Sequence, residues 1–239
     1  MPVAIVTGAS KGLGKALAQG LARQGWSLVL DARGRAALES TADGVRGLLP
    51  ATAQVRAVAG DVTDVGHRRA LILAAEELGG LDLLVNNAST LGASPLPRLV
   101  DLAPGTLRRI VEVNTIAPLA LFQQSLPLLR RSADPRVLNV TSDASLEHYD
   151  SWGGYGSSKA ALDHVSATLC VEEPTIRVWA VDPGDMRTEM HQDAFPGEDI
   201  SDRPLPESVV PALLGLVASD TPGGRIRAAE LVPATGGPR

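Results

Sequence analysis

The N-terminus joins a strand to a glycine-rich turn, and few folds accommodate this combination. Val3 to Thr7 is a predominantly β-branched run, typical of a strand buried on both faces of a parallel sheet. It leads directly into Gly8-Ala9-Ser10-Lys11-Gly12-Leu13-Gly14, and residues 15–19 have helical composition. At such a junction, free amide groups and the positive end of the helix dipole form an anion site. The pattern therefore favours a phosphate-binding turn over a turn that uses glycine only for packing.

The remainder of the chain repeats this strand-then-helix order. Further strands are predicted at residues 27–31, 54–58, 81–86, 136–141, 176–181 and 229–232. Helices are predicted at residues 34–49, 65–78, 104–129, 155–171 and 206–218, the third of them either continuous or bent near Pro118. This alternation predicts an α/β protein with one Rossmann domain over residues 1–239. Its doubly wound parallel sheet should have about seven strands, with helices on both faces.

The composition of the chain argues against several classes of binding partner. The chain has 239 residues, a formal net charge of -5 and no evident Lys/Arg cluster, which argues against nucleic acid as its main partner. The longest apolar run, residues 209–218, is too short to span a bilayer, and no basic leader precedes the first strand. Cys170 stands alone, which excludes an intrachain disulfide, and we expect no metal site. We therefore expect a cytoplasmic protein that binds neither membranes nor nucleic acid.

Residues suited to ligand binding follow several predicted strands near the point where each strand ends. Asp61, Asn87, Ser142 and the pair Pro183-Gly184 all occupy such positions. In doubly wound sheets, ligands bind beyond the carboxyl ends of the strands, where the strand order reverses. These residues are therefore predicted to meet at one site.

Tyr155 and Lys159 form a second, independent signal. If the stretch is helical, the two side chains lie one turn apart on the same face. A nearby ammonium favours the phenolate and lowers the pKa of the phenol, which would make Tyr155 a usable acid or base. A Tyr and Lys at this spacing also recur by chance, so the rest of the chain must decide between these interpretations.

Together these motifs resemble the classical short-chain dehydrogenase/reductase family over nearly the whole chain. Residues 7–14 are similar to its TGxxxGxG turn, and residues 86–89 resemble its NNAG motif with Ser89 in place of glycine. The resemblance implies four catalytic residues, Asn114, Ser142, Tyr155 and Lys159. It also implies the cofactor-binding residues Gly8, Ser10, Lys11, Gly12, Leu13, Gly14, Arg33, Asp61, Val62, Asn87, Ala88, Tyr155, Lys159, Pro183, Gly184 and Thr188.

The resemblance implies hydride transfer between a nicotinamide cofactor and a small carbonyl compound or alcohol. Tyr155 would donate or remove the proton, and Ser142 would hydrogen-bond the substrate oxygen. Lys159 would lower the pKa of Tyr155 and bind the nicotinamide ribose. Asn114 would hold a water that links Lys159 to solvent.

The end of the second strand bears on the choice between NADP and NAD. Arg33 follows Ala32 as in NADP-dependent relatives, and Lys11 is a second cation of the kind those members carry. Asp31 would favour NAD if it addressed the adenine ribose, but neighbouring strand residues point to opposite faces. NADP is therefore the favoured cofactor, with an NAD-dependent alcohol dehydrogenase as the alternative.

The substrate site and the assembly are less closely defined. Ser142, His148, Tyr149 and Met186 are the predicted substrate contacts, beneath a mobile loop at residues 185–206. By family resemblance we expect a homodimer or homotetramer, although the C-terminal segment lacks the usual GxxxxVDGG ending. A non-catalytic nucleotide sensor, or a related epimerase or dehydratase, would share parts of the pattern.

Overall fold

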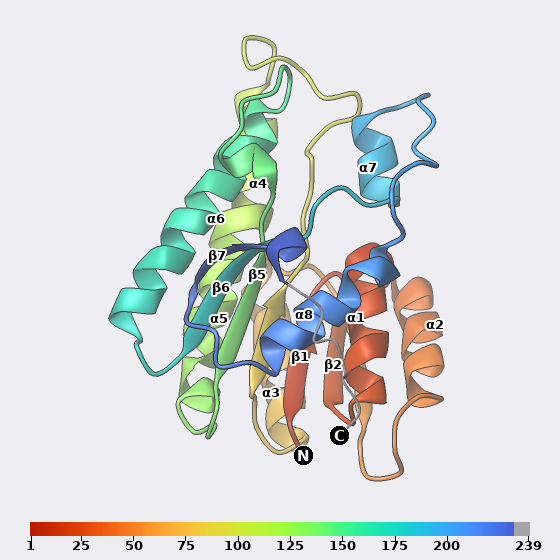
Figure 1. Ribbon diagram of the computed structural model, residues 1–239, viewed down its shortest axis with the longest axis vertical. Coiled ribbons are helices and arrows are strands. Elements are labelled where there is room, and N and C mark those ends of the chain that lie inside the picture. The colour runs from red at the N-terminus through yellow and green to blue at the C-terminus, as the bar shows by residue number, and fades with distance from the viewer. Residues whose placement is uncertain (232–239) are drawn as a thin grey trace.

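The computed structural model describes residues 1–231 and contains a parallel sheet in the order β3-β2-β1-β4-β5-β6-β7 (Figure 1). Every neighbouring pair of strands in this order is parallel. The prediction of a doubly wound Rossmann sheet is confirmed. The strands are β1 (Val3–Val6), β2 (Ser27–Ala32), β3 (Val55–Ala59), β4 (Leu83–Asn86), β5 (Arg136–Val140), β6 (Arg177–Asp182) and β7 (Gly224–Arg227).

Helices cover both faces of the sheet. One face carries α1 (Gly12–Arg23), α2 (Arg35–Arg46) and α8 (Val210–Val217), and the other carries α3 (Val65–Glu77), α5 (Ala117–Leu129) and α6 (Gly153–Glu172). The central strands are buried along their whole length, as their continuous apolar runs predict. The strand order reverses between β1 and β4, which places the ligand edge beyond their carboxyl ends. Within residues 1–231, no helix is long and apolar enough to cross a membrane.

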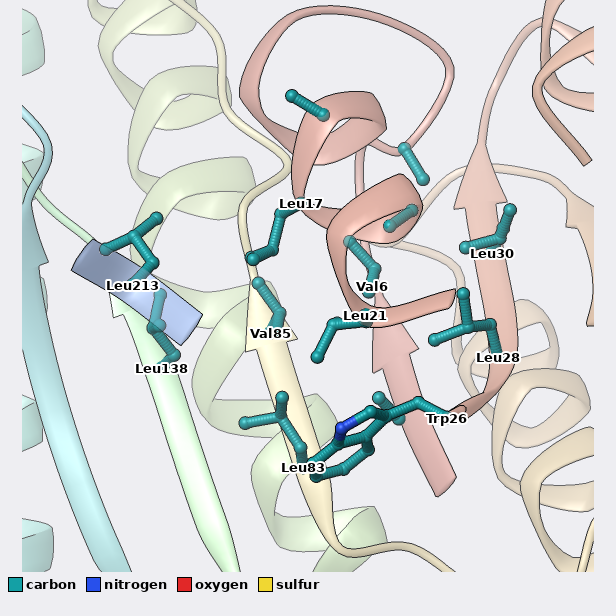
Figure 2. Packing of buried hydrophobic residues seen from close by; sticks show 14 of the residues in the cluster. Val6, Leu17, Leu21, Trp26, Leu28, Leu30, Leu83, Val85, Leu138 and Leu213 are labelled. Carbon is teal, nitrogen blue, oxygen red and sulfur yellow. The ribbon is translucent and has the colours of Figure 1, made fainter. Parts of the chain in front are cut away.

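The larger core cluster lies between the sheet and the face that carries α1. Leu17 and Leu21 of α1 pack over Val6 and Val85, and Leu213 of α8 closes the cluster beside β5 (Figure 2). All five side chains are almost completely buried. This packing fixes the position of α1, and hence of the glycine turn at its N-terminus.

The last strand lies earlier than predicted. The sequence indicated residues 229–232, but β7 pairs with β6 through Gly224–Arg227, and Ala228–Glu230 forms a 3₁₀ turn. The prediction failed because β7 carries two arginines and therefore lacks an apolar run. Arg225 is nevertheless half-buried, since its side chain binds Asp163 on α6. Val232 of the predicted strand is outside the described residues.

Two other segments differ from their predicted form. The predicted helix 104–129 is present without a break, but it includes a π-helical turn at Glu112–Ile116 between α4 (Pro104–Val111) and α5. The predicted loop 185–206 contains the short helix α7 (Glu189–Ala194), which lies beyond the carboxyl edge of the sheet (Figure 1). Neither departure changes the sheet, and both are near the residues predicted to act chemically.

We predict that Leu17→Ala lowers the free energy of unfolding by about 2–5 kcal/mol, because it leaves a cavity beneath α1. Chemical denaturation monitored by circular dichroism measures the change. Leu73→Ala is the matched control, since Leu73 on α3 is 59% exposed and should cost less than about 0.5 kcal/mol. Equal losses for the two variants would contradict the packing described here.

Candidate active site

The glycine turn brings backbone groups closer together than any side chain would allow. A Cβ at Gly14 would lie 2.4 Å from the carbonyl oxygen of Gly8 and 2.5 Å from Nδ2 of Asn87. Lys11, the N-cap residue of α1, makes no side-chain capping hydrogen bond. The N-cap side chain therefore leaves the first backbone amides of α1 free of a capping bond. A helix end that binds phosphate requires such free amides.

Hydrogen bonds join the ends of β1 and β4 at the reversal point. The Thr7 hydroxyl oxygen accepts from the backbone amides of Asn87 and Ala88, both at 3.0 Å. The Asn87 side-chain amide donates to the backbone oxygen of Thr7 at 2.8 Å and to that of Gly8 at 3.2 Å. Asn87 and Ala88 thus lie directly against the glycine turn, as predicted for cofactor-binding residues.

Asp61 is held at the edge of the sheet beyond β3. Its carboxylate accepts from the Thr63 amide at 2.9 Å and from Nη2 of Arg109 at 2.6 Å. Although partial burial acts to raise it, these hydrogen bonds lower the pKa of Asp61 to about 2. Val62 is buried beside Val113, so the Asp-Val pair presents an anion next to an apolar surface.

Asp31 and Arg33 have opposite environments. Asp31 is 1% exposed, and its Oδ1 is 2.6 Å from Nε2 of the buried His67. Burial raises the pKa of Asp31, and the His67 contact opposes that rise. Arg33 is exposed beyond β2 and makes no ion pair within residues 1–231, whereas Lys11 pairs with Glu189 on α7. Asp31 is therefore directed into the protein, away from the exposed end of β2.

Tyr155 and Lys159 lie on one face of α6, as their spacing predicts. They are 8% and 2% exposed, and the Lys159 ammonium is 5.6 Å from the centre of the Tyr155 ring. The ammonium donates to the backbone oxygen of Val140 at 2.7 Å. Gly156 allows α6 to approach the loop after β5, because a Cβ there would lie 2.5 Å from the Ala144 oxygen.

Burial dominates the acid–base properties of this pair. It lowers the pKa of Lys159 to about 8, against the effect of the Asp163 charge. It raises the pKa of Tyr155, while interactions with the Ser89 and Ser142 hydroxyls act in the opposite direction. The predicted lowering of the Tyr155 pKa by Lys159 is therefore not observed, since desolvation of the phenolate outweighs the other effects.

Asn114 lies in the π-helical turn and is completely buried. Its Oδ1 accepts from the Thr90 amide at 2.9 Å and from the Ser89 hydroxyl at 3.1 Å. Its Nδ2 donates to the Thr90 oxygen at 2.9 Å and to the Ser158 hydroxyl at 3.0 Å. All four positions of the side-chain amide are filled. The side chain therefore ties α6 to the loop after β4, and it has no position left for a water.

Ser142 caps a short 3₁₀ turn at the end of β5 and lies close to Tyr155. Its hydroxyl donates to Oδ1 of Asp143 at 2.9 Å and accepts from the Ala144 amide at 3.2 Å. Nη2 of Arg225 donates to the Ser142 backbone oxygen at 3.0 Å, and Nε of Arg225 donates to Asp163 at 3.0 Å. Asp143 and Arg225 are thus site residues that the sequence analysis did not identify.

Aromatic and apolar side chains form the wall beside Tyr155. The Trp152 ring centre is 5.7 Å from that of Tyr155, 5.8 Å from that of Phe195 and 6.5 Å from that of Tyr149. Met190 of α7 packs in the same cluster. The sequence analysis missed Trp152 as a site residue because a single tryptophan outside any motif carries no positional signal.

The predicted substrate contacts are only partly near this wall. Tyr149 joins it and is 48% exposed, and His148 is an exposed neighbour in the same loop. Met186 packs instead against the core cluster that contains α1. Met190 therefore replaces Met186 as the methionine nearest Tyr155.

The segment after β6 closes the site from the other side. The Gly184 amide donates to Asp182 at 3.0 Å, and the Thr188 hydroxyl caps α7 by accepting from the His191 amide at 3.1 Å. A Cβ on Gly12 would lie 3.4 Å from the Thr188 methyl group, so Thr188 is opposite the glycine turn. The structure thus brings Pro183, Gly184 and Thr188 to the same edge as Lys159 and Asn87.

Comparisons with known proteins agree with this geometry. A family model described as short chain dehydrogenase matches residues 2–199. Sepiapterin reductase from Meriones unguiculatus is 35% identical over 200 residues, which cover 80% of this chain and 76% of that protein. The rhamnolipids biosynthesis 3-oxoacyl-(acyl-carrier-protein) reductase from Pseudomonas aeruginosa is 34% identical, with 79% of this chain and 74% of that protein covered.

One solved structure is similar to this protein over nearly the whole length of both chains. The alcohol dehydrogenase from Thermococcus sibiricus, complexed with 5-hydroxy-NADP, superposes with a TM-score of 0.84 at 28% identity and covers 100% of this chain and 99% of that one. The fold and site thus define a Rossmann oxidoreductase that acts on CH–OH or C=O groups. The chain belongs to the short-chain dehydrogenase/reductase family.

We predict a pH-dependent stability that originates at Lys159. Between pH 8 and 10 the unfolded chain holds the lysine proton and the folded chain releases it, so the free energy of unfolding rises with pH. The rise should be on the order of 2 kcal/mol and absent from Lys159→Met, as measured by urea denaturation. The range ends at pH 10 because the raised pKa of Tyr155 reverses the slope above that value. Lys15→Met, at an exposed lysine, is the control and should retain the rise; a rise that persists in Lys159→Met would contradict the assignment.

Proposed function

We propose that this protein is an NADPH-dependent reductase of small carbonyl compounds, with Tyr155 as the acid. One observation carries the proposal: Tyr155 lies within reach of the Ser142 hydroxyl, and Lys159 donates to the end of β5, at the carboxyl edge of the sheet that also carries the glycine turn. Tyr155 is buried, and its phenol is protonated at neutral pH, so it can serve as the proton donor.

The residues fit a dinucleotide cofactor. Gly14 lets the start of α1 pack closely against Gly8 and Asn87, as the turn of a dinucleotide-binding fold requires, and Asp61 and Val62 offer an anion and an apolar surface for an adenine. Residues 8–14, Asn87, Ala88, Lys159 and the segment 183–188 would hold the cofactor. When bound, the nicotinamide supplies the hydride.

In this proposal the protein positions the substrate and moves one proton. Ser142 orients the carbonyl oxygen and stabilises the charge that develops on it. Tyr155 donates its phenolic proton to that oxygen. The Lys159 ammonium, 5.6 Å from the centre of the Tyr155 ring, then stabilises the phenolate that this donation leaves behind. The aromatic wall at Trp152 limits the entry of water.

In this proposal Asn114 would hold the predicted water through its backbone and not through its side chain. Because its side chain is saturated by protein groups, a water that links Lys159 to solvent would have to bind its backbone oxygen. A π-helical turn displaces the usual hydrogen-bond pattern, and such turns occur frequently at functional sites. The side chain would act by holding α6, and therefore Lys159, at a fixed distance from the loop after β4.

NADP preference is supported by the ion pairs at the end of β2. Arg33 has no carboxylate partner within residues 1–231 and could pair with a 2′-phosphate. Asp31 is committed to His67, so it is poorly placed to accept the ribose hydroxyls of NAD. Lys11 could also bind the 2′-phosphate if it were released from Glu189.

The oligomeric state and the cytoplasmic location remain predictions, which sedimentation velocity and cell fractionation would test.

The function is tested with NADPH and a panel of aldehydes and ketones, with turnover followed by nicotinamide absorbance. We expect reduction of at least one compound, and a loss of about 10²–10⁴-fold in kcat for Tyr155→Phe with cofactor binding retained. If NADPH binds but no carbonyl or alcohol is converted, the nucleotide-sensor interpretation is favoured. Full activity in Tyr155→Phe would refute the role of the phenol.

We predict that Arg33→Ala raises the Kd for NADPH about tenfold and leaves the Kd for NADH nearly unchanged, because only NADPH carries the 2′-phosphate. Fluorescence titration measures both constants. Arg46→Ala, at the far end of α2, removes a similar exposed charge and should change neither. Tighter binding of NADH than of NADPH by the unmodified protein would reverse the cofactor assignment.

A further inference from the structure

Asp143 is a carboxylate in direct contact with the proposed substrate-orienting serine. Its Oδ1 accepts from the Ser142 hydroxyl at 2.9 Å and from the Ala144 amide at 2.8 Å. Its Oδ2 accepts from the Tyr149 hydroxyl at 2.9 Å. A carboxylate can accept about four hydrogen bonds, so one position remains for a further donor.

No protein cation neutralises this charge. Within residues 1–231, no nitrogen of a lysine, arginine or histidine side chain lies within 4 Å of the Asp143 carboxylate. The nearby Arg225 is occupied by Asp163 and by the Ser142 backbone oxygen. Two other carboxylates near this site have a cationic partner, since Glu147 faces Arg227 and Asp185 faces Arg203. Asp143 is half-buried, and a half-buried carboxylate without a counter-ion favours an incoming positive charge.

One aromatic side chain contacts this carboxylate and connects it to a cluster of rings. Tyr149 donates its hydroxyl to Asp143 and packs edge-on against Trp152, which in turn contacts Tyr155 and Phe195. Ammonium groups are attracted to the faces of such rings, with tryptophan the most effective. The negative character of the region is apparent in the raised pKa of Tyr149, which results mainly from its hydrogen bond to Asp143, with smaller contributions from Glu147 and Asp185.

We propose that Asp143 and the Trp152 ring form a subsite for an ammonium group, so that the preferred substrates are ketones or aldehydes with an amino group close to the carbonyl carbon. The inference rests on the proposed reductase function and specifies its substrate class. Compounds with a carboxylate or phosphate at the same position should be disfavoured by the charge of Asp143.

The subsite would also couple recognition to catalysis. The Ser142 hydroxyl has one hydrogen, and it is directed to Asp143 rather than to a substrate oxygen. An ammonium bound at Asp143 supplies alternative donors to that carboxylate. Ser142 can then turn its hydroxyl hydrogen to the carbonyl oxygen of the substrate. With a neutral ketone the same rotation would leave the Asp143 carboxylate with one hydrogen bond fewer.

The test compares three phenyl ketones of nearly equal size, namely 2-amino-1-phenylethanone, propiophenone and benzoylacetate. In the unmodified protein we expect kcat/KM to fall in that order. In Asp143→Asn the ratio of kcat/KM for the amino ketone to that for propiophenone should fall about tenfold, while the relative activity toward benzoylacetate rises. Comparing ratios between proteins removes the intrinsic difference in ketone reactivity. An unchanged ratio would overturn the proposal.

Asp150→Asn is the matched control, because Asp150 lies in the same loop but is highly exposed and faces Arg98. It should leave the ratio unchanged, and an equal fall in this variant would also overturn the proposal by showing a general charge effect.

A binding measurement separates this inference from the proposed function. With NADP⁺ present, tryptophan fluorescence should report tighter binding of 2-phenylethylamine than of phenylacetate, and the preference should disappear in Asp143→Asn. If no ketone is reduced but this preference is found, the reductase function fails while the ammonium subsite stands. If the amine does not bind, or binds equally well to Asp143→Asn, the subsite is refuted whatever the outcome for ketone reduction.

Discussion

The fold and the site both depend on the contact between the ends of β1 and β4. Thr7 and Asn87 exchange hydrogen bonds there although they are 80 residues apart in the chain. Buried polar groups at such a point must find partners within the protein, so the contact is specific as well as close. It lies where the strand order reverses, and it holds together the glycine turn, the loop after β4 and the N-terminal end of α1.

Several ionisable groups are buried along the same edge, at a cost to stability. Within residues 1–231, Lys159 has only a backbone oxygen as a hydrogen-bond partner, and burial lowers the pKa of its ammonium. Burial raises the pKa of Asp182, with Arg225 at 3.6 Å as its nearest cation. The large apolar clusters on both faces of the sheet stabilise the fold sufficiently to hold these groups out of water. Residues with perturbed pKa values concentrate at the functional edge of the molecule, as is common in enzymes.

The sequence was sufficient to predict the order of the strands and helices through β6, because continuous apolar runs and glycine turns have strong local signatures. It also predicted that Tyr155 and Lys159 share one face of a helix and that Ser142 follows a strand, and both placements are confirmed because they depend on local geometry. It could not predict Arg225, Asp143 or Trp152 as site residues. Their importance comes from contacts made across the fold, such as the one between Arg225 and Ser142, 83 residues apart. The pKa of Tyr155 was also unpredictable, because burial is a property of the packed structure.

The contact between Arg225 and the backbone of Ser142 has a consequence for the synthesis of this chain. Arg225 belongs to the last strand of the described sheet, so it emerges from the ribosome after β1 to β6 and all eight α-helices of residues 1–231 have been made. Until β7 docks beside β6, the Ser142 loop lacks this partner, and Asp163 lacks its counter-ion. A nascent chain can therefore form most of its core before the site acquires its final geometry, which delays full activity until translation has passed the last strand.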